Sequence, residues 1–136
     1  MIRTLSALAG VALLAACAPE AAAPSLAGSV WRPVTVGTLA VPDDIETVVR
    51  FGADGTATGN GGCNNFNGGY TESGDGLAFG PMMSSSMACP DPAMEVEGAL
   101  FAAFAATAST RRDGSGLVLL DGAGTELAVL RPSEGD

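Results

Sequence analysis

The sequence contains no histidine and no lysine among its 136 residues. Without histidine, the chain can build neither a Cys-His nucleophile nor a Cys/His zinc site. Its six basic residues stand against 15 acidic ones, and the formal net charge is −9. Such an excess of negative charge repels nucleic acids and anionic headgroups at long range. The composition therefore disfavours a nucleic-acid partner and removes the usual base of hydrolytic enzymes.

Long apolar runs are missing beyond the N-terminus, since no later segment approaches the roughly 18 to 20 residues that span a bilayer. The N-terminus itself has Arg3, an apolar run from Leu5 to Ala12, and a small-residue cleavage site, Leu14-Ala15-Ala16-Cys17. Because it ends on cysteine, this site resembles a bacterial lipobox. It predicts that residues 1–16 are a lipoprotein signal peptide and that Cys17 carries the lipid. The alternative is an ordinary secretory signal, and under either interpretation the chain leaves the cytoplasm.

The segment that follows Cys17 is small and punctuated by proline, which is typical of a flexible tether. We assign residues 17–27 to the lipidated cysteine and tether, 28–132 to one domain, and 133–136 to a polar tail. Because Ala18 and Pro19 follow Cys17 in place of aspartate, the resemblance to lipoprotein sorting signals implies the outer membrane, facing the periplasm, in a Gram-negative host. The chain is long enough for one domain of roughly 100 to 150 residues and too short for two.

Within the domain, apolar and polar residues alternate between glycine-containing turns, which predicts antiparallel hairpins. The expected strands are residues 30–36, 45–51, 56–59, 67–72, 77–79, 117–120 and 126–130. Pro33 should place the first strand at an edge or a bulge. The sequence thus predicts a small antiparallel sheet.

Residues 93–108 break this pattern, because Val96, Leu100, Phe104 and Ala108 recur every four positions. They predict one helix that packs against the sheet. We expect Asp91 to cap this helix, Pro92 to occupy its first turn, and Glu95 and Glu97 to lie near the positive end of its dipole.

Cys63 and Cys89 are the two cysteines of the domain. In an oxidising envelope they should form a disulfide, which stabilises the fold by about 3.5 kcal/mol in the chain-entropy model. A redox-active pair is the alternative, although the spacing is not the Cys-X-X-Cys that lowers a thiol pKa.

A set of motifs in fixed order resembles the META domain of HslJ-like bacterial lipoproteins. The motifs are Trp31, Val49 to Gly55, Gly59 to Tyr70 with its Gly-Gly-Cys-Asn block, Leu77 to Phe79, Met87 to Pro90, Gly116 to Asp121 and Glu126-Leu127. One departure concerns Ser85 and Ser86, because similar sequences often carry a threonine and a basic residue before this methionine.

The resemblance implies an α+β fold, a small antiparallel barrel-like sheet with one helix packed against it. It implies turn roles for Gly61, Gly62, Gly68 and Gly69, local hydrogen bonding by Asn64, and a motif position for Tyr70. It brings no catalytic residues. Relatives are associated with heat and envelope stress, and their fold has been likened to lipoprotein pilotins.

Other chemistries lack complete motifs. The run Ser84-Ser85-Ser86 has no nucleophile elbow, and residues 59–69 lack the lysine of a phosphate loop. Asp54, Asn60, Asn64, Asn65 and Asn67 do not follow the order of a calcium loop. We therefore expect no catalytic residue, no metal site and no cofactor.

The sequence favours a non-catalytic, monomeric, lipid-anchored envelope domain that binds a protein partner or client in an envelope or heat stress response. The alternative is a periplasmic inhibitor that plugs the cleft of a hydrolase such as a protease or a lysozyme.

Overall fold

The computed structural model describes residues 24–134 of the chain. The predicted signal peptide (residues 1–16), Cys17, tether residues 18–23 and tail residues 135–136 lie outside the described residues. Among residues 24–134 there is no helix with the length and hydrophobicity that crossing a membrane requires.

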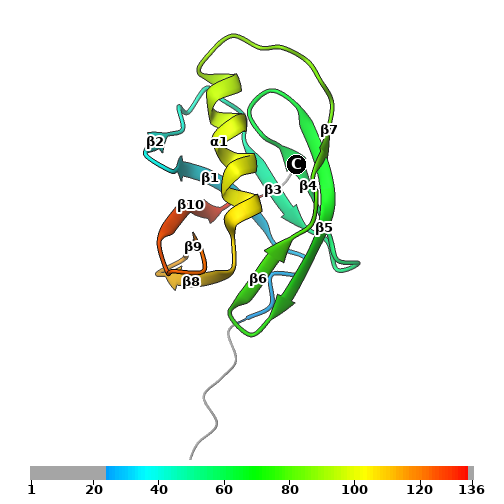
Figure 1. The fold of residues 1–136 in the computed structure, drawn as a ribbon, viewed down its shortest axis with the longest axis vertical. Coiled ribbons are helices and arrows are strands. Elements are labelled where there is room, and N and C mark those ends of the chain that lie inside the picture. Colours follow the sequence, from blue (N-terminus) through cyan, green and yellow to red (C-terminus); the bar gives the residue numbers. More distant parts are fainter. Residues whose placement is uncertain (1–23, 135–136) are drawn as a thin grey trace, which may run out of the picture.

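One antiparallel sheet of ten strands and one helix make up the described part of the chain (Figure 1). The elements are β1 Val30–Val36, β2 Leu39–Ala40, β3 Val48–Phe51, β4 Thr56–Asn60, β5 Asn65–Ser73, β6 Gly76–Phe79, β7 Met83–Ser84, α1 Ala93–Ala106, β8 Ser109–Asp113, β9 Gly116–Leu120 and β10 Glu126–Pro132. The strand order is β10-β9-β8-β6-β5-β4-β3-β1-β2, and β7 pairs with β5. The predicted α+β fold class is confirmed.

The sheet closes into a barrel-like ring because β1 pairs with β3 on one side and with β10 on the other. The register of β1 against β10 shifts between Pro33 and Thr35, so the bulge expected at this proline is present. The shortest pairing in the ring is between β6 and β8, where the register contains the single pair Gly76↔Ser109. In Figure 1, α1 lies across this side of the ring, and it contacts β1, β6 and β10.

Aromatic rings fill the space between α1 and the sheet. Phe104 of α1 lies 4.5 Å from Phe79 and 5.4 Å from Phe66, measured between ring centroids. Phe101 contacts Phe66 edge to face at 5.7 Å. The apolar stripe of the helix therefore packs against the sheet, as its four-residue spacing predicts.

The helix begins at Ala93 as predicted, but its last residue and its cap differ from the prediction. The helix ends at Ala106, two residues early, because Thr107 has an extended backbone and donates its hydroxyl to the Ala103 carbonyl at 2.7 Å. The cap position is Pro92 and no side chain makes a capping hydrogen bond, so the capping role predicted for Asp91 is wrong. Asp91 is exposed, and the Asp91–Pro92 peptide bond is cis.

One predicted strand starts later than expected, and three observed strands were not predicted. β3 begins at Val48 because residues 42–45 form a turn in which Ile45 donates to the Pro42 carbonyl. The short strands β2 and β7 were not predicted. Neither was β8, whose sequence Ser-Thr-Arg-Arg-Asp has no apolar alternation.

The packed domain begins before residue 28. Leu26, within the segment assigned to the tether, is 2% exposed and belongs to the core. Its backbone nitrogen donates to both carboxylate oxygens of Glu72, at 3.2 and 2.8 Å. The chain thus reaches the domain at the β6 end of β5.

Candidate functional site

The connection from β6 to α1, residues 80–92, is the most exposed apolar part of the described chain, and we call it the methionine segment. Met83 is 71% exposed and Met87 is 58% exposed, and these are the large hydrophobic side chains with high exposure in the described residues. Residues 76–90 contain no charged side chain. This combination marks the segment as a candidate contact surface.

A buried hydrogen-bond network fixes the segment to the sheet. The Asn64 amide nitrogen donates to the Met87 carbonyl at 3.1 Å, and its amide oxygen accepts from the Met87 nitrogen at 2.8 Å. The Ser85 hydroxyl donates to the same amide oxygen at 3.0 Å. Asn64 therefore holds the backbone of Met87 and the side chain of Ser85, through the local hydrogen bonding that the motif implied.

Glu97 completes this network from α1. Glu97 is 4% exposed, and its carboxylate accepts hydrogen bonds from the backbone nitrogens of Cys63 and Asn64, at 3.0 and 2.6 Å, and from the Asn64 amide at 2.7 Å. Three donors satisfy the buried carboxylate, so it positions the β4–β5 turn. The sequence had assigned Glu97 only a helix-dipole role, because nothing local marks its tertiary partners.

The disulfide predicted between Cys63 and Cys89 is confirmed, with a Cα–Cα distance of 5.9 Å. It joins the β4–β5 turn to the last residues of the methionine segment, just before α1. The segment is therefore held by one covalent bond and by the Asn64 hydrogen bonds.

The four motif glycines have two different roles. Gly62 has a φ of +127° and lies in the turn, as predicted. Gly61 is also in this turn, and it permits the approach of Glu97, because a Cβ there would lie 2.9 Å from the Glu97 Cγ.

Gly68 and Gly69 do not form a turn, since both lie within β5. A Cβ on Gly68 would lie 2.6 Å from the Met82 sulfur, so this glycine makes room for the methionine segment. The turn role predicted for these two glycines is replaced by a role in strand packing.

Tyr70 of the motif is partly buried and packs against the core. Its ring contacts Phe51 edge to face at 5.0 Å, and its hydroxyl donates to the Gly52 carbonyl at 2.6 Å. Burial raises the pKa of Tyr70 above its usual 10.0, and the charges of Glu72 and Asp54 raise it further. The hydroxyl therefore holds the β3–β4 turn.

Two of the polar residues considered as calcium ligands form hydrogen bonds within turns, and Asn65 and Asn67 lie within β5. Asp54 accepts from the Thr56 nitrogen at 3.0 Å, and Asn60 accepts from the Gly62 nitrogen at 2.8 Å and donates to Asn65 at 3.1 Å. Across residues 24–134, no three Cys, Asp or Glu side chains lie together in a way that could hold a metal ion.

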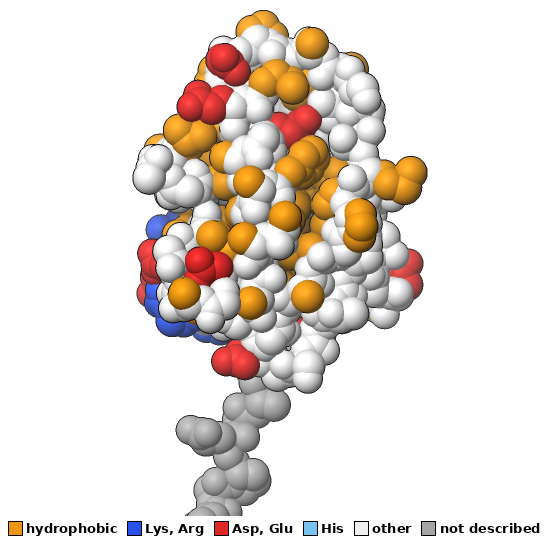
Figure 2. Space-filling view, in the orientation of Figure 1, with side chains coloured by type: hydrophobic (Ala, Val, Ile, Leu, Met, Phe, Trp, Pro, Cys, Tyr) orange, Lys and Arg blue, Asp and Glu red, His pale blue; other side chains and the backbone are white. Residues whose placement is uncertain are grey.

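Figure 2 shows where the apolar surface gathers. Orange side chains lie along α1 and beside it, whereas the blue arginines in this view are confined to the lower left. The outward positions of α1 include Gly98, Ala102 and Ala105.

A separate hollow of about 370 Å³ is lined by Asn65, Phe66, Asn67, Met83, Ser84 and Ser85, over β5 and β7.

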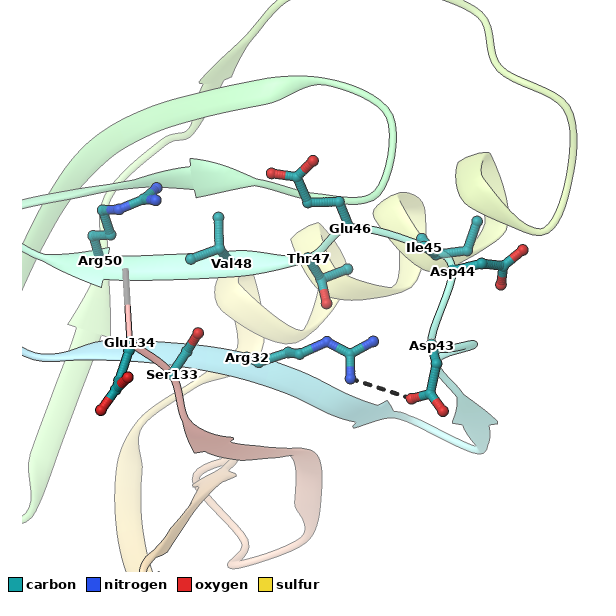
Figure 3. Close-up of a pocket in the computed structure, with 10 residues that line it drawn as sticks. All are labelled: Arg32, Asp43, Asp44, Ile45, Glu46, Thr47, Val48, Arg50, Ser133 and Glu134. Carbon is teal, nitrogen blue, oxygen red and sulfur yellow. Dashed lines mark hydrogen bonds and ion pairs between the residues drawn. The ribbon is translucent and has the colours of Figure 1, made fainter. Parts of the chain in front are cut away.

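A second hollow, of about 360 Å³, lies beside β1 and β3 (Figure 3). Its lining residues are Arg32, Asp43, Asp44, Ile45, Glu46, Thr47, Val48, Arg50, Ser133 and Glu134. Arg32 forms an ion pair with Asp43 at 3.4 Å and donates to the Pro42 carbonyl at 3.2 Å. Charges of both signs line this open hollow, so it has no clear preference for an anion or a cation.

The methionine segment and the start of the domain lie at opposite ends of β5. Leu26 contacts Glu72 near one end, whereas Ser85 donates to the Asn65 carbonyl at the other. The nine residues of β5 extend over about 26 Å, at roughly 3.3 Å for each step. In Figure 1 the described chain starts at the bottom and the methionine segment passes over the top.

Comparisons with known proteins agree with this architecture. An NMR structure of a protein from Burkholderia xenovorans superposes with a TM-score of 0.65 and 22% identity, over 88% of this chain and 97% of that chain. A crystal structure of a DUF4847 family protein from Bacteroides vulgatus ATCC 8482 has a TM-score of 0.61 and 15% identity, over 82% and 96% of the two chains. These similarities establish the fold.

No curated protein gave a significant match to the sequence. The family model of the META domain matches residues 24–134, the same residues that form the ring, the helix and the Asn64 network. The chain therefore belongs to the META domain family.

Proposed function

We propose that the chain is a non-catalytic, lipid-anchored envelope domain that presents the methionine segment to a protein partner, in a response to envelope or heat stress. The observation that carries this proposal is the exposure of Met83 and Met87 on a segment that has no charge before Asp91 and is attached to the sheet by a disulfide and hydrogen bonds. Contiguous exposed apolar surface is typical of interaction sites, and methionine adapts to varied partners.

Because the methionine segment is attached to the sheet, we favour a role in binding a partner over a role as a flexible connection between β6 and α1. The disulfide and the Asn64 hydrogen bonds restrict the backbone on both sides of Met87 before any partner arrives. Less conformational entropy is then lost on association, and affinity rises accordingly.

The position of the segment also fits an anchored protein. With a lipid at Cys17, the chain would meet the domain at Leu26, beside Glu72. The methionine segment contacts Asn65 at the other end of β5, about 23 Å away at roughly 3.3 Å for each residue. It would therefore face away from the membrane surface.

Inhibition of a hydrolase is the second candidate function. The observation that favours it is the rigidity of an exposed loop closed by a disulfide, because a preorganised loop can occupy a cleft with little loss of entropy. The two candidates differ in the identity of the partner.

Affinity purification from detergent-solubilised envelopes tests the proposal, with the full-length lipidated chain as bait. We expect one protein to be retained in about a 1:1 ratio. The double substitution Met83→Ser and Met87→Ser should reduce this retention at least about tenfold. Leu39→Ser, an apolar-to-serine change on β2, is the matched control and should leave retention unchanged.

Different outcomes separate the candidates. Retention of an outer-membrane assembly factor or a client favours the envelope domain, whereas retention of a protease or a lysozyme favours the inhibitor. If the wild-type chain retains no protein under native and heat-stressed growth, the proposed function is wrong.

A further inference from the structure

The strand within the methionine segment has one free edge. β7 pairs with β5 through Phe66↔Ser84 and Asn67↔Met83, and the Ser85 nitrogen donates to the Asn65 carbonyl at 3.2 Å. In an antiparallel ladder, successive residues direct their backbone groups to opposite sides. The N–H and C=O groups of Ser84 therefore point away from β5, where no strand of residues 24–134 pairs with β7.

This edge is open because the neighbouring part of the ring is incomplete. β8 reaches β6 only at Gly76↔Ser109, with flanking backbone bonds from Leu77 to Ala108 and from Thr110 to Asp75. Beyond Leu77, α1 takes the place of a neighbouring strand. A helix packs through side chains, so the backbone of Ser84 gains no ladder partner from it.

The edge strand β7 is only two residues long, but it carries no charged side chain that would oppose strand addition. Natural sheets protect exposed edges with charged side chains, above all lysine. Residues 76–90 have no charge, and Ser84 is exposed. Pro81 precedes β7 and leaves the N–H groups of residues 82–86 in place.

Apolar side chains lie beside the edge. Met82 and Phe101 are only partly buried and pack against the core, and Phe101 contacts Phe66 at 5.7 Å. Figure 2 shows orange side chains between α1 and the β5–β7 side of the domain. A strand that paired with Ser84 would place every second side chain toward this apolar surface.

We propose that the free edge at Ser84 binds an extended segment of a partner protein by β-augmentation, with apolar residues at alternate positions and basic residues at the end near α1. The inference rests on the proposed function and specifies its partner. Charge complementarity supports the basic residues, because Asp91 and Glu95 are exposed where the segment meets the helix. Backbone pairing supplies affinity in such complexes, and the alternate side chains supply specificity.

The direct test uses the full-length lipidated chain in detergent micelles and a fluorescent octapeptide, Lys-Val-Thr-Val-Thr-Val-Thr-Lys. Binding is followed by fluorescence anisotropy, with empty micelles as the blank. We expect saturable binding by the wild-type chain. Replacing both lysines of the peptide by glutamate should weaken binding at least about threefold at low salt.

Two substitutions locate the edge that binds. Ser84→Pro removes the outward N–H and should weaken binding at least tenfold, on the order of 1.4 kcal/mol. Ala40→Pro is the matched control, because Val41 donates to the Val34 carbonyl and the Ala40 N–H therefore also points away from its neighbour β1. It removes an outward edge donor from β2 and should leave peptide binding unchanged.

A second measurement needs no change in the protein. The same peptide, N-methylated at alternate residues, keeps its side chains but loses the donors along one edge, and it should bind at least tenfold more weakly. Equal affinity for the methylated peptide, or undiminished binding by Ser84→Pro, overturns the proposal. So does concentration-dependent dimerisation that Ser84→Pro abolishes, since the occupant is then a second copy of the chain.

The peptide test and the affinity purification fail independently. If the wild-type chain binds no peptide but still retains a partner from envelopes, the edge assignment is wrong and the proposed function stands. If the peptide binds at Ser84 but no envelope protein is retained, the edge is competent for strand addition and the proposed function is wrong.

Discussion

Asn64 donates two hydrogen bonds to the single carboxylate of Glu97, from its backbone nitrogen at 2.6 Å and from its side-chain amide at 2.7 Å. The two residues are 33 positions apart and both are buried. The pair joins the first half of α1 to the β4–β5 turn, from which Asn64 also holds Met87. The position of the exposed segment thus depends on a buried carboxylate.

Glu97→Gln should destabilise the domain by about 2 to 3 kcal/mol. The new NH2 group would face an N–H donor that now donates to a carboxylate oxygen, so one buried hydrogen bond would be lost. Asn64 cannot rotate to compensate, since its oxygen and nitrogen are both bonded to Met87. Urea unfolding measures the change. Glu95→Gln, in the exposed first turn, is the control and should change stability by less than about 0.5 kcal/mol.

Replacing Cys63 and Cys89 together by serine should lower the free energy of unfolding by about 2 to 4 kcal/mol, the usual range for a disulfide that closes a medium loop. Urea unfolding of the variant and of the oxidised protein gives this difference. Thiol trapping under denaturing conditions checks the premise, and two free thiols in protein from the envelope would contradict it.

Tyr70 predicts an alkaline limit to stability. Its pKa is raised in the folded state, first by burial and then by Glu72 and Asp54, so the folded protein keeps a proton that the unfolded chain loses near 10.0. Stability should therefore be unaffected below this pH and should fall as the pH rises from there toward the folded pKa.

Because Tyr70 is the only tyrosine, tyrosinate absorbance reports its titration directly. The midpoint should lie above 10.0 in folded protein and move toward it in urea. Tyr70→Phe should cost about 1 kcal/mol at neutral pH through loss of the bond to Gly52, and it should remove the alkaline fall. A folded midpoint at or below the unfolded one would refute this prediction.

Arg32 and Arg131 occupy directly opposed positions on β1 and β10. Like charges in such a pair repel, so Arg131→Thr should stabilise the domain by a few tenths of a kcal/mol, and by less at high salt. Arg111→Thr is the comparison, because Arg111 forms an ion pair with Glu126 and its loss should bring no gain. Thermal unfolding at low and high salt measures both variants.

The anchoring proposal predicts that Cys17→Ser leaves the precursor unprocessed, because the substitution removes the sulfur that would carry the lipid. Mass spectrometry and detergent partitioning of envelope fractions test this. Recovery of the variant in the detergent phase at the mature mass would show that the lipobox interpretation is wrong.

Local sequence patterns predicted most of the fold. Alternation placed six of the ring strands within two residues of their observed bounds, and the four-residue spacing from Val96 to Phe104 located the helix. β8 was missed because Arg111 and Arg112 replace the apolar side chains that mark a strand. Its partners come from β9 and from one residue of β6, which no local pattern shows.

The candidate site was less predictable because it depends on contacts distant in sequence. Glu97 has the sequence context of a solvent-facing dipole residue, and its burial follows from the approach of Gly61, which lacks a Cβ. The absence of charge from residue 76 to residue 90 was the available signal for an exposed apolar segment. The open edge at Ser84 follows only from the strand order.

The narrow join between β6 and β8 also concerns motion. Breaking the pair Gly76↔Ser109 and its two flanking hydrogen bonds opens the ring at this join, while β1 still links β3 to β10 and the longer ladders of β3, β4 and β5 stay intact. Local fluctuations draw on the weakest cooperative unit of a protein. The sheet can therefore open locally on the side covered by α1, and the contact between the side chains of Phe79 and Phe104 restrains this opening.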